Sequence, residues 1–313
     1  MAKLFQGIFP ALLTPFKGEA EGQEVDEGAF RENVSRYNGF DLAGYVIGGS
    51  TGECALLSNE ETSRLVEEAK SAAAPGRLII AGTAQESTRL TVEFTKRLAD
   101  RGADAALVRP PSYYKSKMTR EALRRHYLAV ADASPVPVII YNIPQNTGVA
   151  IDPGLVVELA QHPKIRGLKE SSGSLAYLGE IIRDLPADFS YLVGSGYVVL
   201  PALLAGASGA VLAVANAAPK LCLEIYRLFR EGSLAEAQER QLDLIPLNKA
   251  VMETYGIPGL KYALDIQGYK GGPVRLPLLP IDEQGRATLR SLIRGQVYCS
   301  PISDEESFGR QIK

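Results

Sequence analysis

The chain has 313 residues, of which 46% are hydrophobic and 22% charged, so it is long enough for one large α/β domain or two smaller ones. Its 34 Lys and Arg residues nearly balance its 36 Asp and Glu residues, which disfavours a nucleic-acid-binding protein with a basic face. The sequence has no apolar run of 18 residues and no signal-peptide-like apolar core at its start. We therefore expect a cytoplasmic protein with no membrane contact.

The cysteines and histidines predict neither disulfides nor a metal site. The three cysteines, Cys54, Cys222 and Cys299, are widely spaced and odd in number, which argues against a disulfide framework. The two histidines, His126 and His162, have no familiar zinc-binding spacing with them. We expect a protein without a metal ion or cofactor.

Apolar, β-branched runs alternate with amphipathic helical stretches through most of the chain. The expected strands are residues 7–14, 44–47, 78–81, 105–108, 138–141, 165–169, 191–194 and 210–214. The expected helices after the first six are 26–38, one opening at Ser58, 87–101, 119–133, 152–161 and 174–185, and a helical segment follows each of the last two strands. Glu61 lies three residues after Ser58, so the second helix should begin with a capping box.

Eight strand–helix units predict a parallel sheet with crossover helices. The strands are continuous apolar runs, which is typical of strands buried on both faces. Eight units within about 230 residues match the size of a closed (β/α)8 barrel, the TIM barrel. A doubly wound open sheet is the alternative.

The alternation stops after Gly232. Helical patterns at residues 234–255, 258–267 and 282–294 predict a small C-terminal helical appendage. We divide the chain into a catalytic barrel over residues 1–232, a helical extension over 233–296 and a flexible tail over 297–313.

Catalytic groups of such barrels lie at the carboxyl ends of the strands and in the loops that follow. The second strand ends in GGSTGE (residues 48–53), the fourth in RPPSYY (109–114), the fifth in YNIPQNTG (141–148) and the sixth in Lys169. Hydroxyl groups, a lysine and glycine-rich turns therefore collect at one face. No series of carboxylates or histidines occurs at these strand ends, which disfavours hydrolysis and metal chemistry.

Lys169 follows a short apolar run and precedes small hydroxyl residues. A lysine at the end of a buried strand can lose part of its hydration, which favours the neutral amine. A neutral amine can attack a ketone and form a Schiff base. The alternative is a surface lysine that caps the strand.

The other motifs each have a catalytic and a structural interpretation. The glycines of residues 48–52 let backbone amides approach a carboxylate or phosphate, or they only form a tight turn. Tyr141 can transfer protons through Ser50 or another tyrosine, or it fills the core. Tyr113 and Tyr114 serve the site, or they form a hydrophobic contact between subunits.

In this order along the chain, GGSTGE, the Tyr-Tyr pair, YNIPxxTG and GLKESS resemble the dihydrodipicolinate synthase and N-acetylneuraminate lyase family. The resemblance extends from residue 7 to about residue 294. It implies a class I aldolase or lyase that acts on pyruvate or another 2-oxo acid together with an aldehyde. It also suggests a homotetramer, built as a dimer of dimers.

The resemblance also implies catalytic roles for four residues. Lys169 would form the Schiff base with the ketone of the 2-oxo acid. Tyr141 would act as the general acid and base. Ser50 and Tyr114 would complete a proton relay of hydroxyl groups, with Tyr114 reaching in from a neighbouring subunit.

Four residues are expected to bind the 2-oxo acid by the same resemblance. The amides of Ser50 and Thr51 would hold its carboxylate. Gly194 and Val211 would line the pocket through their backbone.

One departure concerns the second substrate. Synthases of the dihydrodipicolinate type usually carry an arginine five residues after the strand-five tyrosine, and here that position is Asn146. The segments GIPGLK (256–261) and GYKGGP (268–273) look more like 4-hydroxy-2-oxoglutarate aldolases, which release pyruvate and glyoxylate. Ser171 would then lie near the distal carboxylate. We rank this aldolase first and dihydrodipicolinate synthase second.

Arg109 complicates this ranking, because its guanidinium can replace the missing charge if it points into the barrel mouth. Otherwise it is a solvated arginine that packs beneath Tyr113. Feedback inhibition by lysine is not expected, since the positions that match that regulatory site are Asn59, Thr62 and Leu90 rather than histidines and a glutamate. A non-catalytic protein that binds 2-oxo acids is the hypothesis from another functional class.

Overall fold

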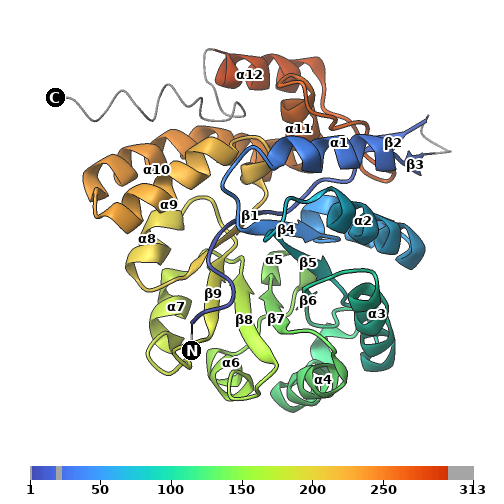
Figure 1. The fold of residues 1–313 in the computed structure, drawn as a ribbon, viewed down its shortest axis with the longest axis vertical. Coiled ribbons are helices and arrows are strands. Elements are labelled where there is room, and N and C mark those ends of the chain that lie inside the picture. The colour runs from blue at the N-terminus through green and yellow to red at the C-terminus, as the bar shows by residue number, and fades with distance from the viewer. Residues whose placement is uncertain (1, 19–22, 295–313) are drawn as a thin grey trace.

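The computed structural model describes residues 2–18 and 23–294, and its centre is a barrel of eight parallel strands (Figure 1). The barrel strands are β1 (Gly7–Pro10), β4 (Gly44–Ile47), β5 (Leu78–Gly82), β6 (Ala105–Val108), β7 (Val138–Asn142), β8 (Ile165–Glu170), β9 (Ser190–Val193) and β10 (Gly209–Leu212). Neighbouring strands pair in the order β1-β10-β9-β8-β7-β6-β5-β4. A parallel bridge between Ala11 and Val46 joins the two ends of this series. The predicted TIM barrel is confirmed.

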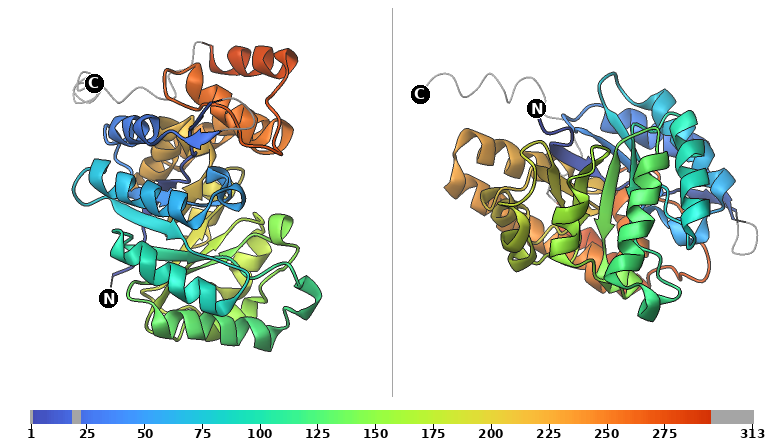
Figure 2. Two further views of the ribbon diagram at one scale, coloured as in Figure 1. Left: turned by 90° about the vertical axis from the view of Figure 1, so that its right-hand side faces the viewer. Right: turned by 90° about the horizontal axis from the view of Figure 1, so that it is seen from below.

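Helices connect the strands, and all of them except the single-turn helix after β7 surround the barrel (Figures 1 and 2). They are α1 (Glu27–Tyr37), α2 (Asn59–Ala72), α3 (Thr88–Asp100), α4 (Arg120–Ala133), α5 (Pro144–Thr147), α6 (Pro153–Leu159), α7 (Leu175–Ile181), α8 (Val199–Leu204) and α9 (Pro219–Glu231). Several begin at residues whose side chains accept a hydrogen bond from a free N–H group of the first turn. At α2 the Ser58 side chain accepts from the N–H of Glu61, and the Glu61 carboxylate accepts from the N–H of Ser58. This is the predicted capping box.

Successive side chains of each strand point alternately into the barrel and towards the helices, so the core has two layers. On β7, Ile139 and Tyr141 belong to the apolar cluster inside the barrel, whereas Val138 and Ile140 pack in the layer between strands and helices. Both layers are buried, which explains why the strands are continuous apolar runs.

The extension consists of α10 (Leu234–Lys249), a π-helical turn η5 (Ala250–Thr254), α11 (Gly256–Asp265) and α12 (Glu283–Ile293). It begins after Gly232, which ends α9 in the left-handed conformation (φ 80°). In Figures 1 and 2 it lies along one side of the barrel, with α10 beside α9. The division of the chain at residue 232 stays a prediction, and the predicted tail lies outside the described residues.

The strand expected at residues 7–14 and the helix expected at 174–185 each end several residues earlier in the structure. The strand expected at residues 7–14 ends at Pro10. The N–H groups of Ala11 and Leu12 still donate to the carbonyls of Leu212 and Val46, and the N–H of Leu13 then donates to the Asn216 side chain. The chain then forms a small antiparallel pair of β2 (Phe16–Lys17) and β3 (Glu24–Val25). The helix expected at 174–185 ends at Ile181, before a turn that leads to a proline. Within residues 2–18 and 23–294, no helix has the length and apolar character that crossing a bilayer requires.

Candidate active site

A cavity of about 520 Å³ opens at the carboxyl ends of the barrel strands. Eight of the residues singled out from the sequence lie in its wall: Ser50, Thr51, Tyr141, Asn146, Lys169, Ser171, Gly194 and Val211. They come from five different strands or the loops after them, so closure of the barrel is what brings them together.

Lys169 and Tyr141 are neighbours across β8 and β7. The Lys169 side chain is only 3% exposed, and its Nζ lies 4.1 Å from the centre of the Tyr141 ring. Both side chains point inward, because they alternate with Leu168 and Ile140, which face the helices. The lysine is therefore buried beside a phenol rather than exposed at a strand end.

The turn after β4 presents Ser50 and Thr51 to the same cavity. Gly48 has φ 65°, and its carbonyl oxygen would lie 2.0 Å from a Cβ at Gly82, so both positions need glycine. Ser50 and Thr51 begin a short 3₁₀ helix, and the first N–H groups of a helix have no acceptor within it. These amides can bind an anion.

Glu170 is a buried carboxylate that the sequence analysis did not single out. It accepts hydrogen bonds from the backbone N–H groups of Ser172 (2.7 Å) and Gly173 (3.2 Å) and from the Asn142 amide (3.3 Å). Its own carbonyl accepts from the N–H of Gly194 at 2.6 Å. Glu170 thereby fixes the turn that follows Lys169 and holds Ser171 at the cavity wall.

Gly194 is the tightest point of that wall, since a Cβ added there would lie 1.9 Å from Oγ of Ser171. We expect Gly194→Ala to push Ser171 into the cavity and raise the KM for a 2-oxo acid about tenfold or more, because small displacements in a site have large effects. Steady-state kinetics measure this. The control is Gly179→Ala on α7, where an added Cβ meets nothing within 4 Å. An unchanged KM in Gly194→Ala would contradict this role.

The extension supplies part of the wall that sequence reasoning missed. Asn248 lies in the last turn of α10, and Val251, Met252 and Glu253 follow on the π-helical turn η5. Burial raises the pKa of Tyr197, which also lines the cavity, and a hydrogen bond with Glu253 adds to this rise. π-Helical turns recur at functional sites, but the sequence pattern of a π turn differs little from that of an α-helix.

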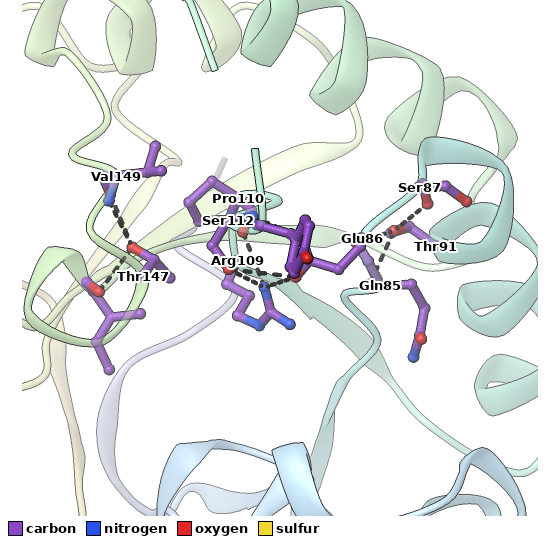
Figure 3. Close-up of polar contacts among 11 residues, drawn as sticks. Gln85, Glu86, Ser87, Thr91, Arg109, Pro110, Ser112, Thr147 and Val149 are labelled. Atoms are coloured by element: carbon purple, nitrogen blue, oxygen red, sulfur yellow. Dashed lines mark hydrogen bonds and ion pairs between the residues drawn. The ribbon is translucent and has the colours of Figure 1, made fainter. Parts of the chain in front are cut away.

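Arg109 does not reach the wall around Asn146. Figure 3 shows its guanidinium directed to Glu86, at 3.0 Å, and to the carbonyl of Pro110, at 3.1 Å. It lines a smaller, adjoining cavity of about 210 Å³, together with Asn59 and Thr62 from the positions considered for lysine inhibition. Arg109 is thus paired with Glu86 outside the wall around Asn146, and its role as a substitute charge stays a prediction.

Tyr114 lies away from its own chain's cavity. Its side chain is 70% exposed, and its ring packs edge-on against Tyr113 with 5.0 Å between the ring centres. A contribution of Tyr114 to a neighbouring subunit stays a prediction. In the part of the chain that the structure describes, no group of three His, Cys, Asp or Glu side chains could hold a metal ion.

A TIM barrel with a buried lysine and a tyrosine in one cavity at its strand ends has the architecture of a class I aldolase, which works through a lysine Schiff base. The model of the Dihydrodipicolinate synthetase family matches residues 4–296. The chain belongs to this family, and it is an enzyme of the Schiff-base-forming aldolase type.

Relatives and solved structures agree with this assignment. A protein of Methanothrix thermoacetophila named 4-hydroxy-tetrahydrodipicolinate synthase is 38% identical over 293 residues, which cover 93% of this chain and 96% of that protein. The dihydrodipicolinate synthase structure from Bacillus anthracis has a TM-score of 0.88 and 29% identity, and the match covers 95% of this chain and all of that one. The chloride-inhibited synthase of Acinetobacter baumannii, solved in complex with pyruvate, has a TM-score of 0.85 and 32% identity, with 92% and 97% covered.

Proposed function

We propose that this enzyme is a lyase of the aldolase type that activates pyruvate, or another 2-oxo acid, as a Schiff base on Lys169. The observation that carries the proposal is the buried Lys169 amine in the wall of a cavity, 4.1 Å from the centre of the Tyr141 ring. The pyruvate complex of the Acinetobacter baumannii relative supports pyruvate as the donor.

The cavity residues divide the work of this reaction. The N–H groups of Ser50 and Thr51 bind the carboxylate of the 2-oxo acid and direct its ketone to Lys169, and such positioning removes part of the barrier. The amine adds to the ketone, water leaves, and the resulting iminium withdraws electrons from the adjacent carbon. A C–C bond can then form or break at that carbon. Tyr141 moves protons on and off the carbinolamine and the aldol oxygen, with Ser50 in the relay.

The names of the relatives bear on the second substrate. Proteins that are 33% to 38% identical to this chain are named 4-hydroxy-tetrahydrodipicolinate synthase. These names favour the hypothesis that the sequence analysis ranks second, a synthase that condenses pyruvate with aspartate semialdehyde. The similarity covers at least 91% of the chain in each case, so the barrel and the extension are both included.

One observation in the site favours the second candidate, an aldolase that cleaves 4-hydroxy-2-oxoglutarate to pyruvate and glyoxylate. Asn146 lies in the cavity wall where the synthases usually carry an arginine, and Arg109 is paired with Glu86 instead of replacing it. Losing a charge-assisted, two-pronged contact to a carboxylate typically costs about 1.5–3 kcal/mol of binding.

Turnover of the two substrates distinguishes the candidates. The synthase reading predicts a higher kcat/KM for pyruvate plus aspartate semialdehyde, and the aldolase reading predicts a higher value for 4-hydroxy-2-oxoglutarate. Turnover of neither substrate would contradict both candidates for the acceptor.

A variant at Asn146 tests the missing charge. We expect Asn146→Arg to lower the KM for aspartate semialdehyde by roughly 10- to 100-fold, because the guanidinium restores a charged contact to its carboxylate. Asn146→Gln is the matched control, since it lengthens the side chain without adding charge. If both variants change the KM equally, the charge at this position does not select the acceptor.

The remaining proposals concern the context of the reaction. The expected partners are small molecules, namely a 2-oxo acid and an aldehyde. Binding to nucleic acid or to a membrane is not expected. We propose a homotetramer in the cytoplasm, and the exposed Tyr113 and Tyr114 mark the expected tight interface between subunits. Sedimentation of the purified protein measures this state.

A further inference from the structure

Glu53 ends the turn that presents Ser50 and Thr51. Among the described residues it is the one non-glycine residue with a left-handed backbone (φ 58°, ψ 34°). This conformation is unfavourable for a residue with a Cβ, so it persists only where the surroundings hold it. The N–H of Glu53 donates to the carbonyl of Ser50 at 3.1 Å and closes the turn.

The Glu53 carboxylate forms a fully buried ion pair with Lys261 of α11. Nζ of Lys261 lies 2.6 Å from the carboxylate, and the two side chains are 1% and 0% exposed. Nζ also donates to the carbonyl of Pro273 at 2.6 Å and lies 4.3 Å from the centre of the Phe16 ring. The extension therefore contacts the turn at residues 50–53 on the side away from the cavity.

A second contact from the extension supports the first. The backbone N–H of Arg275 donates to the other oxygen of Glu53 at 3.0 Å. Its guanidinium donates to both carboxylate oxygens of Glu61, at 2.7 and 3.1 Å, and to the carbonyl of Leu56 at 2.9 Å. The segment from residue 53 to the start of α2 is thus held against the extension.

A buried ion pair is a poor source of net stability, because removing two charges from water costs about as much as their attraction returns. An apolar pair of similar size often gives a more stable protein. What this pair does provide is a fixed direction for Glu53. The turn is fixed from the other side by the Thr14 hydroxyl, which donates to the carbonyl of Gly52 at 2.8 Å.

We propose that the Glu53–Lys261 pair is a positioning device, through which the C-terminal extension holds the Ser50–Thr51 turn in the geometry that binds the carboxylate of the 2-oxo acid. This inference rests on the proposed function. It predicts that the pair sets the affinity for pyruvate and leaves the chemistry at Lys169 intact.

The pair should make pyruvate affinity depend on pH. Burial lowers the pKa of Lys261 from 10.5 to about 8, although Glu53 and Asp265 oppose this shift and Arg275 adds to it. As the pH rises through about 8, Lys261 loses its proton and the pair is lost. Between about pH 8 and 10.5, Lys261 is protonated in the unfolded chain and neutral in the folded chain. The titration of Lys261 therefore does not lower the free energy of unfolding as the pH rises in this range. The loss of affinity is therefore separate from unfolding.

The test is the double variant Glu53→Gln/Lys261→Met, which removes both charges and leaves neither one buried alone. Borohydride trapping of pyruvate is measured over a range of pyruvate concentrations and from pH 7 to pH 9.5. We expect the half-saturating pyruvate concentration to rise about tenfold or more, with unchanged labelling at saturation. We also expect the alkaline loss of affinity to be absent in the variant.

Arg166→Gln/Asp188→Asn is the matched control, because it removes a partly buried ion pair at the opposite end of β8. Half-saturation should stay at the wild-type value in this control. An unchanged half-saturation in the Glu53 and Lys261 variant would overturn the positioning role. A pH profile of affinity that is the same in the wild-type protein and in the double variant would also overturn it. If wild-type Lys169 is not labelled at all, the proposed function itself fails.

Discussion

Replacement of Lys169 by methionine should reduce turnover by about 10⁴-fold or more, because no other group in the cavity can form the covalent intermediate. Lys169 is the one lysine in the cavity wall formed by the described residues. Methionine keeps an unbranched side chain of similar length beside the Tyr141 ring, so the core should remain packed. The measurement is kcat with the preferred acceptor, at pyruvate concentrations well above the wild-type KM.

The control for this variant is Lys96→Met, which removes an exposed lysine from α3. It should keep wild-type turnover. Thermal unfolding of both variants shows whether they are folded. A folded Lys169→Met protein with more than a few per cent of wild-type turnover would contradict the role of the amine.

Replacement of Tyr141 by phenylalanine should lower kcat by about 10²- to 10⁴-fold, the usual contribution of a positioned acid–base group. The ring remains, so the contact with Lys169 Nζ and the packing inside the barrel are preserved. Only the phenol hydroxyl is removed, so the KM for pyruvate should change much less than kcat.

Tyr45→Phe is the matched control, because Tyr45 is also a buried tyrosine of a barrel strand and its hydroxyl donates to the Asn38 side chain. We expect it to lose stability and to keep its kcat. An equal fall of kcat in both variants would show that loss of a buried hydroxyl, and not acid–base chemistry, explains the result at Tyr141.

The barrel and its reactive centre could be predicted from the sequence for a physical reason. Strands buried on both faces are continuous apolar runs, and their number and spacing limit the topology. The carboxyl ends of parallel strands meet at one face, so the end of each run indicates a site residue. Lys169 and Tyr141 end neighbouring strands, and parallel pairing makes them neighbours in space.

The contributions of the extension could not be predicted in this way. Lys261 pairs with Glu53, more than 200 residues earlier in the chain, and no periodicity indicates such a contact. Asn248 in the last turn of α10 and Glu253 on the π-helical turn both line the cavity. Each placement depends on how the helices pack on the barrel, which local patterns do not determine.

The second substrate was the least predictable feature. The direction of Arg109 depends on Glu86, a partner from the preceding strand–helix loop, and no local pattern of the sequence indicates this pairing. The missing charge at Asn146 pointed to the aldolase, whereas the relatives' names favour the synthase. Family membership determines the covalent chemistry, while the acceptor depends on a few side chains in the cavity wall.

The central claim is the Schiff base at Lys169, and trapping it with borohydride tests it most directly. The protein is incubated with pyruvate, reduced, digested and analysed by mass spectrometry. We predict that one pyruvate-derived group is attached to the peptide that contains Lys169, and that the label is absent from Lys169→Met. An unmodified Lys169 in wild-type protein, or a label on another lysine, would contradict the account.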